Sequence, residues 1–292
     1  MTNLRNNFNW NIIDDFSFPD SRIEKAFNNV MVRARKMESD HHQRKIVWRW
    51  AAVAAIIILP ALTLLIVGQF VEKTPAAAIL TAAAANGQTK TIYLPDSTKV
   101  ILNSGTVLFY PEKFSNKERR VCLSGEAIFD VTEDKTLPFL VSTSDITIKV
   151  FGTLFDVQAY PESRIVTTTL CRGSIGISRN SAPDDVAMLH PGEEFKMVKS
   201  EGSFKISSVE AEDAIIWKNG GICLNNGNIY DLINIIERQF DVNIYLTSEK
   251  YNSEVITAKF IHGESIEDIL KVISRLLPGM TFTIINNNIY IH

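Results

Sequence analysis

The apolar and polar positions near the start of the chain follow the period of a helix. In residues 20–37, apolar side chains recur every three or four positions, as on one face of a helix. Ser21, with Glu24 three residues later, has the form of a capping box. An apolar stripe gains stability only when it is covered, so we expect this helix to bind a partner, to lie on a membrane surface, or to close on residues 10–18 as a hairpin. The stripe consists of Ile23, Ala26, Phe27, Val30, Met31, Ala34 and Met37.

A longer apolar run follows, because residues 50–68 contain no charged side chain. As a helix rising about 1.5 Å per residue, this run would extend over roughly 28 Å, close to the hydrocarbon core of a bilayer at about 30 Å. It predicts a single membrane span within residues 47–71, in which Pro60 is the only helix breaker and can be accommodated. A secretory signal peptide is the alternative, since alanines follow at 76–78 and 82–85, but its apolar core would be only about 7 to 15 residues long.

Charge is distributed unequally on the two sides of this run. Six Lys or Arg residues lie between positions 33 and 49, whereas Lys73 is the only one between positions 69 and 89. Because positive flanks stay in the cytoplasm, residues 1–46 are expected inside the cell and the rest outside. The outer part, residues 72–292, has 21 Lys or Arg against 27 Asp or Glu. This mildly acidic part has no basic footprint, so direct nucleic-acid binding is not expected.

The pattern beyond the span is that of β-strands. Residues 72–88 are rich in alanine and are predicted to be a linker. In residues 89–215, short runs of Val, Ile, Thr, Phe and Tyr are interrupted by Pro, Gly, Asn and Asp, which predicts an all-β domain of solenoid-like or sandwich-like architecture. Gly125 and Gly152 are interpreted as turns between strands. The expected strands are residues 91–94, 99–102, 107–110, 121–123, 127–131, 139–142, 146–150, 155–160, 165–170, 174–177, 186–189, 194–198 and 204–209.

Residues 216–292 are predicted to form a small α+β module of two strand–helix–strand units. In the first unit, Asn228 caps a helix between strands at 222–224 and 242–246. In the second, a strand at 255–261 precedes a helix that begins at Ser265 and stops at Pro278-Gly279, and strands at 281–285 and 289–291 form a closing hairpin. The helices carry the apolar stripes Ile229, Leu232, Ile233, Ile236 and Phe240, and Ile266, Ile269, Leu270, Ile273 and Leu277.

The sequence contains only weak candidates for catalytic or metal-binding residues. Ser124-Gly125-Glu126 and Gly152-Thr153 carry hydroxyls and a carboxylate, but no histidine lies near them in the sequence. His41-His42 lacks a third ligand nearby, and neighbours on a helix point about 100° apart, so a zinc site is not expected there. The sequence contains no P-loop, dinucleotide-binding or HExxH motif. We therefore predict no catalytic residue, no cofactor and no metal.

The three cysteines, Cys122, Cys171 and Cys223, all lie in apolar runs of the outer part, without CxxC spacing. An odd number leaves at least one thiol unpaired within the chain. We interpret them as small buried side chains, with one disulfide and one free thiol as the alternative.

Seven short motifs follow one another in the outer part of the chain. They are Leu94-Pro95-Asp96-Ser97, Leu102-Asn103-Ser104, Tyr110-Pro111, Gly125-Glu126-Ala127-Ile128-Phe129-Asp130-Val131, Pro138-Phe139, Phe151-Gly152-Thr153-Leu154-Phe155-Asp156-Val157 and Leu189-His190-Pro191-Gly192-Glu193. In order and spacing they resemble the FecR family of transmembrane anti-sigma factors in the form found in Bacteroidetes. The segment after Trp217 resembles the secretin/TonB short N-terminal type of module.

This resemblance implies a relay across the bacterial inner membrane. A TonB-dependent outer-membrane transporter would signal to the periplasmic part of the chain, and the cytoplasmic segment would bind an extracytoplasmic-function sigma factor and control its release. From the helical period, we expect Ile23, Phe27, Val30 and Met31 to contact the sigma factor, with Trp10 as an outlying anchor. Two alternatives remain at this point: an anchored periplasmic module that binds a ligand without any sigma-factor partner, and an anchored hydrolase.

Overall fold

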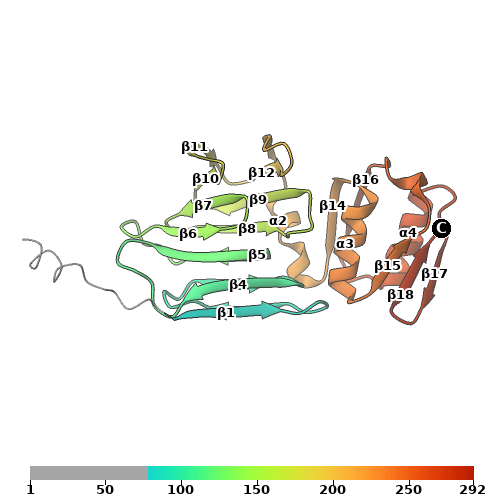
Figure 1. The fold of residues 1–292 in the computed structure, drawn as a ribbon, viewed down its shortest axis with the longest axis horizontal. Helices are drawn as coiled ribbons and strands as arrows, with labels where there is room; N and C mark the ends of the chain where they lie inside the picture. Colours follow the sequence, from blue (N-terminus) through green and yellow to red (C-terminus); the bar gives the residue numbers. More distant parts are fainter. Residues whose placement is uncertain (1–77) are drawn as a thin grey trace, which may run out of the picture. The chain divides into compact units, whose positions relative to one another are not determined.

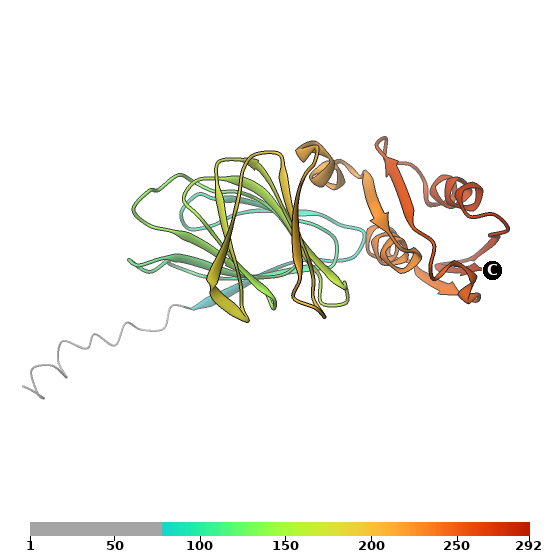
Figure 2. The same ribbon diagram turned by 90° about the horizontal axis from the view of Figure 1, so that it is seen from above.

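The computed structural model describes residues 78–292 (Figures 1 and 2). The predicted N-terminal helix, the span within residues 47–71 and the predicted sigma-contact residues lie outside the described residues; those contact residues are Trp10, Ile23, Phe27, Val30 and Met31. Between residues 78 and 292, no helix is both long enough and apolar enough to cross a bilayer. The described residues belong to one compact unit with two separate hydrophobic cores.

The first core lies inside a thirteen-stranded β domain built as a sandwich. Two sheets share strand β5 (Arg119–Asp130). Sheet 1 has the order β1 (Ile79–Ala84), β4 (Thr106–Pro111), β5, β6 (Phe139–Ser142), β7 (Ile146–Val150), β10 (Ile175–Arg179) and β11 (Ala182–Leu189). Sheet 2 has the order β2 (Lys90–Tyr93), β3 (Lys99–Leu102), β5, β8 (Leu154–Ala159), β9 (Ile165–Arg172), β12 (Glu193–Val198) and β13 (Phe204–Ser208).

Successive hairpins alternate between the two sheets. The pairs β6–β7 and β10–β11 belong to sheet 1, whereas β8–β9 and β12–β13 belong to sheet 2. Their inward side chains form one cluster, in which the rings of Phe129 and Phe155 stack with centroids 5.3 Å apart. Of the two predicted all-β architectures, the sandwich is therefore the one observed, and it closes on a single core between two layers.

Strand β5 is longer than predicted because Gly125 lies inside it and not in a turn. Its first half pairs with β4 and β6, and its second half pairs with β3 and β8. At this change of sheet Gly125 has φ 122°, and a Cβ there would come within 2.4 Å of Thr106 Oγ1. Only glycine fits this conformation and this close approach. The prediction of two strands separated by a turn was wrong here, whereas Gly152 does lie in the bend between β7 and β8.

The predicted linker at residues 72–88 is wrong for its second half. Ile79–Ala84 is strand β1, which pairs antiparallel with β4 at the end of sheet 1. Ala82 and Ala84 point into the core. Alanine has a low β propensity, so the alanine-rich composition suggested a spacer. Pairing with β4 instead makes the segment a strand whose small side chains pack into the core.

The second core lies in the C-terminal module, where both predicted strand–helix–strand units are observed. Strand β14 (Ile222–Gly227) leads into helix α3 (Ile229–Phe240), which Asn228 and Asp231 cap reciprocally, and β15 (Asn243–Leu246) follows. After the short helix η3 (Glu249–Tyr251), β16 (Ile256–Phe260), α4 (Ile266–Leu276), β17 (Phe282–Ile285) and β18 (Asn288–Ile291) complete the module. The sheets are β14–β16 and β15–β18–β17. The short helices α2 (Ala211–Ala214) and η2 (Ile216–Asn219), which were not predicted, connect β13 to β14.

One buried cation ties the sandwich loops together. Arg119 opens strand β5 and is only 2% exposed. Its guanidinium donates to Asp96 Oδ2 at 2.8 Å, to the Thr132 carbonyl at 2.8 Å and, through Nη2, to the Leu137 carbonyl at 2.9 Å, and it lies 5.5 Å from the centre of the Phe139 ring. A buried charge is tolerated only when it is paired and hydrogen-bonded, and Arg119 is paired with Asp96 and donates from all three guanidinium nitrogens.

Replacement of Arg119 by methionine should lower the free energy of unfolding by about 3 kcal/mol, because the Asp96 carboxylate and two carbonyls lose their donor. Urea-induced unfolding followed by circular dichroism would measure this loss. The matched control is Arg120→Met, since Arg120 forms an exposed ion pair with Glu118 and should contribute less than about 1 kcal/mol. Equal losses in the two variants would contradict the role given to Arg119.

Candidate functional site

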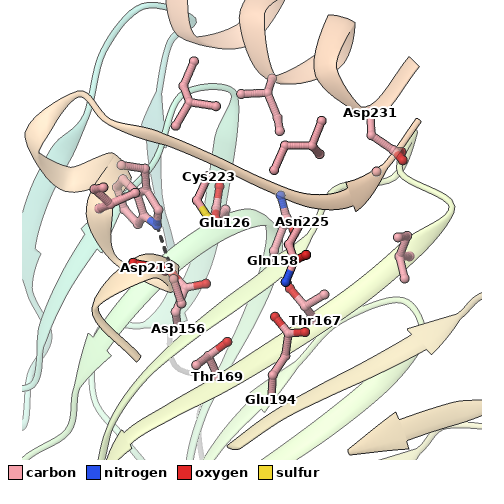
Figure 3. A pocket seen from close by; sticks show the side chains of 18 of the residues that line it. Glu126, Asp156, Gln158, Thr167, Thr169, Glu194, Asp213, Cys223, Asn225 and Asp231 are labelled. Carbon is pink, nitrogen blue, oxygen red and sulfur yellow. Dashed lines mark hydrogen bonds between the residues drawn. The ribbon is translucent and has the colours of Figure 1, made fainter. Parts of the chain in front are cut away.

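A cavity of about 720 Å³ lies between sheet 2 and the C-terminal module (Figure 3). Its size is typical of sites for small ligands, which occur preferentially where two structural layers meet. Strands β8, β9, β12 and β13 supply its floor, and η2, β14 and α3 supply the other side. The cavity is thus built from parts that are distant in the sequence.

The floor consists of the outward-facing residues of sheet 2. Along β8 and β9, core residues such as Phe155 and Val157 alternate with residues on the opposite face. This two-residue period sends a row of polar side chains into the cavity. The row comprises Asp156, Gln158, Thr167, Thr169 and Glu194, all labelled in Figure 3.

Asp156 and Glu126 are carboxylates with almost no access to bulk solvent. Asp156 is 3% exposed, and its Oδ1 accepts a hydrogen bond from Trp217 Nε1 at 3.2 Å. Glu126 is 8% exposed, and its Oε2 accepts from Asn103 Nδ2 at 2.6 Å and from the Tyr160 hydroxyl at 3.5 Å. In the part of the chain that the structure describes, neither carboxylate has a cation within ion-pair distance.

Burial dominates the electrostatics of these groups. It raises the pKa of Glu126 to about 7, although the bond from Asn103 and the charge of Arg238 oppose the shift. The pKa of Asp156 is also raised well above its usual range, first by burial and then by the charge of Glu126. Burial likewise raises the pKa of Glu194, with Lys196 acting in the opposite direction. The cavity therefore concentrates acids that hold their protons more tightly than exposed ones.

The C-terminal module is fixed to the β domain beside this cavity by Arg238 near the end of α3. Its guanidinium lies 3.7 Å from the centre of the Tyr160 ring and forms a 2.9 Å ion pair with Glu162. Its carbonyl accepts a hydrogen bond from the Gly87 amide at 2.7 Å. A cation over an aromatic face, paired with a carboxylate and only 13% exposed in its side chain, is a strong directional contact. Arg238 and the Trp217–Asp156 bond are thus two contacts that hold the module against sheet 2, and we call this interface the seam.

A second surface lies on the three-stranded sheet of the module. The register places Tyr245, Tyr290 and Thr283 side by side, on the face opposite Ile244 and Ile289 of the core. The two tyrosine rings stack with centroids 5.2 Å apart. Strand β17 is an edge of this sheet, and Ile285 on it is exposed. An exposed edge beside aromatic side chains is a surface to which another strand can be added.

The residues considered for catalysis are not brought together. Thr153 donates to the Ser174 carbonyl at 3.1 Å, and His190 is exposed beside Glu193. Among residues 78–292, no group of three His, Cys, Asp or Glu side chains converges as a metal site would require. Glu126 was noted in the sequence for its carboxylate, but its burial in a cavity was not foreseen, and Asp156, Glu194 and Trp217 were missed as site residues. A carboxylate inside an apolar run, such as Asp156 between Phe155 and Val157, was the available signal.

The cysteine interpretation needs one correction. No disulfide joins the three thiols, and Cys171 and Cys223 are partly buried, but Cys122 is exposed. It lies on β5 between the inward-facing Val121 and Leu123, so the two-residue period turns its side chain to the outer face. Cys223 lines the cavity.

Comparison with known proteins places the β domain and the C-terminal module in one family. The family model described as FecR protein matches residues 80–176, and the model described as FecR, C-terminal matches residues 221–291. A candidate anti-sigma factor from Parabacteroides distasonis ATCC 8503, solved at 2.50 Å, has 28% sequence identity and a TM-score of 0.70 over 74% of this chain and 99% of that chain. A 1.65 Å crystal structure of the same description has 28% identity and a TM-score of 0.69 over 73% and 98%. No curated protein shows significant similarity to the chain. The resemblance predicted from the motifs is confirmed.

The buried carboxylates should make stability depend on pH. Folded Glu126 keeps its proton up to about pH 7, whereas an ordinary glutamate loses it near 4.5. Between these values the unfolded chain is the first to ionise, so stability should fall as pH rises, by on the order of 3 kcal/mol for this group. Urea unfolding measured from pH 4.5 to 8 would test this.

The informative variant is Glu126→Gln, which keeps an acceptor for Asn103 but cannot ionise. It should flatten the decline in stability between pH 4.5 and 7 and leave the variant more stable than the wild type at pH 8. Glu112→Gln, a change at an exposed position, is the matched control and should reproduce the wild-type slope. A wild-type slope in the Glu126→Gln variant would show that another group carries the effect.

Proposed function

Because this chain belongs to the FecR-like family of anti-sigma factors, we propose that it relays a signal from a TonB-dependent outer-membrane transporter to an extracytoplasmic-function sigma factor. The family is one of regulators and not of enzymes, and an anti-sigma factor has a sigma factor as its partner. In the proposed arrangement, residues 1–46 hold the sigma factor in the cytoplasm, residues 47–71 span the inner membrane, and residues 78–292 lie in the periplasm.

One observation supports docking of the transporter on the C-terminal module. One side of the module is bound to the β domain, and its three-stranded sheet is accessible to a partner. Arg238 and Trp217 fix it to the β domain. The edge strand β17 and the face that bears Tyr245 and Tyr290 lie on its other sheet and are open to a partner. A signalling domain that adds a strand to β17 would gain main-chain hydrogen bonds from the edge and specificity from the tyrosines.

The seam between module and β domain supplies a means of transmission. It is held by a few directional polar contacts and contains a cavity, unlike the continuous apolar packing inside either core. Polar contacts of this kind have discrete alternative arrangements, and an interface built from them can shift without unfolding either side. Docking on β17 would act on the β domain, and through it on the membrane span, by changing this seam.

Deletion of residues 218–292 should uncouple transporter-dependent induction from transcription while leaving membrane insertion intact. A sigma-dependent reporter gene measures the first effect, and membrane fractionation measures the second. Unchanged induction in the deletion variant would refute docking on the module.

A point variant refines this test without removing the module. Tyr245→Asp places a charge on the proposed docking face and should lower induction at least about fivefold. Tyr93→Asp is the matched control, because Tyr93 is an exposed tyrosine of the β domain, remote in sequence from the module. If both variants lower induction equally, the effect is not specific to the docking face.

The cytoplasmic half of the proposal rests on the predicted stripe Ile23, Phe27, Val30 and Met31, with Trp10 as an outlying anchor. Residues 1–46 used as bait should recover a sigma factor from a lysate of the native host, identified by mass spectrometry. Phe27→Asp should abolish recovery, because the stripe is expected to supply the apolar contacts. Asn29→Asp, off the stripe, should retain it. Recovery of no sigma factor by the unmodified bait would count against the assignment.

A further inference from the structure

We propose that the cavity between sheet 2 and the C-terminal module binds a small organic cation, in which an ammonium or guanidinium group is attached to a polar body. The proposal concerns residues of the periplasmic part alone and does not depend on the sigma-factor relay.

Three carboxyl groups that no described cation pairs line the cavity. Asp156, Glu126 and Glu194 all line it, and within residues 78–292 none of them forms an ion pair. Three basic side chains, Lys196, Lys205 and Arg238, also line the cavity, and none of them forms an ion pair with these carboxylates. Arg238 is already committed to Glu162 and Tyr160. A buried carboxylate gains most from a cation brought to it, since burial has removed its water.

Two groups on the cavity lining have hydrogen-bonding capacity that no described residue uses. Asp156 Oδ1 accepts the Trp217 indole proton, but no described residue donates to the other oxygen. Thr169 is 2% exposed, lines the cavity beside Asp156 and Glu194, and has no hydrogen-bond partner for its hydroxyl among the described residues (Figure 3). Both groups line the cavity, so a donor that enters it can bond to them. The buried side-chain atoms without a partner in the described chain are two others, Thr168 Oγ1 and Arg179 Nε.

The lining also decides between classes of ligand. The carboxylates do not converge as a metal ion would require, and their charge disfavours an anion. Amide and hydroxyl groups, including Gln158, Thr167 and Asn225, surround them and suit a ligand with further hydrogen-bonding groups. An ammonium or guanidinium carries several donors on one charged group, so it can satisfy Asp156, Thr169 and a second carboxylate together.

Matched probes separate charge from shape in the experiment. Glucosamine and N-acetylglucosamine form one pair, and cadaverine and 1,5-pentanediol form another, so each pair contains a cation and a neutral analogue. Titration calorimetry on the purified full-length chain at pH 8 should show binding of at least one cation, at least tenfold tighter than its neutral analogue. Equal binding within both pairs, or no binding of either cation, would overturn the proposal.

Variants of the cavity residues then test whether the cation binds there. Asp156→Asn keeps an acceptor for Trp217 but removes the charge, and it should weaken cation binding at least tenfold. Glu112→Gln, remote from the cavity, should bind as the wild type does. Circular dichroism melts identify a variant that fails to fold, and in that case Thr169→Val, which removes the unpaired hydroxyl, replaces it and should weaken binding at least threefold. Wild-type affinity in folded Asp156→Asn and Thr169→Val variants would also overturn the proposal.

Discussion

The described structure depends on one strand that serves two sheets. Strand β5 leaves sheet 1 and enters sheet 2 at Gly125, where the close approach of Thr106 excludes any side chain. Because the two sheets are covalently continuous through β5, their inner faces are held in register over a single core. The same strand carries Arg119 at its start and Glu126 directly after the change of sheet. The constraint that closes the sandwich therefore also positions a carboxylate of the cavity.

The seam beside that cavity has a different physical character from the two cores. Each core is a continuous set of apolar side chains, whereas the seam relies on Arg238, on the Trp217–Asp156 bond and on carboxylates that burial disfavours. Buried acids without cations reduce stability, and they are retained at sites where something other than stability is needed. A regulator that responds to a partner needs an interface of low stability between two parts that are each stable.

Local pattern predicted most of the fold. Runs of Val, Ile, Thr, Phe and Tyr between turn residues located most strands of the β domain, and the capping residues Asn228 and Ser265 located helices α3 and α4. Besides the short helices α2 and η2, strand β1 and the continuity of β5 were not predicted, for physical reasons. Alanines in β1 are buried by pairing with β4, which composition does not reveal, and Gly125 marks a change of partner strands that a local reading interprets as a turn. The site was less predictable, because Asp156 and Trp217 meet only through tertiary packing across 61 positions of sequence.

The position of the cavity has a consequence for signalling. A ligand that satisfies Asp156 would act on the bond by which Trp217 holds the module, while a partner on β17 would pull on the same module from its other sheet. Both events would bias one seam, and coupling between two binding events is reciprocal. A ligand that tightens the seam would therefore oppose a partner whose docking loosens it, by the same factor by which that partner weakens the ligand. The uncompensated acids of sheet 2 would in this way set how readily docking moves the module.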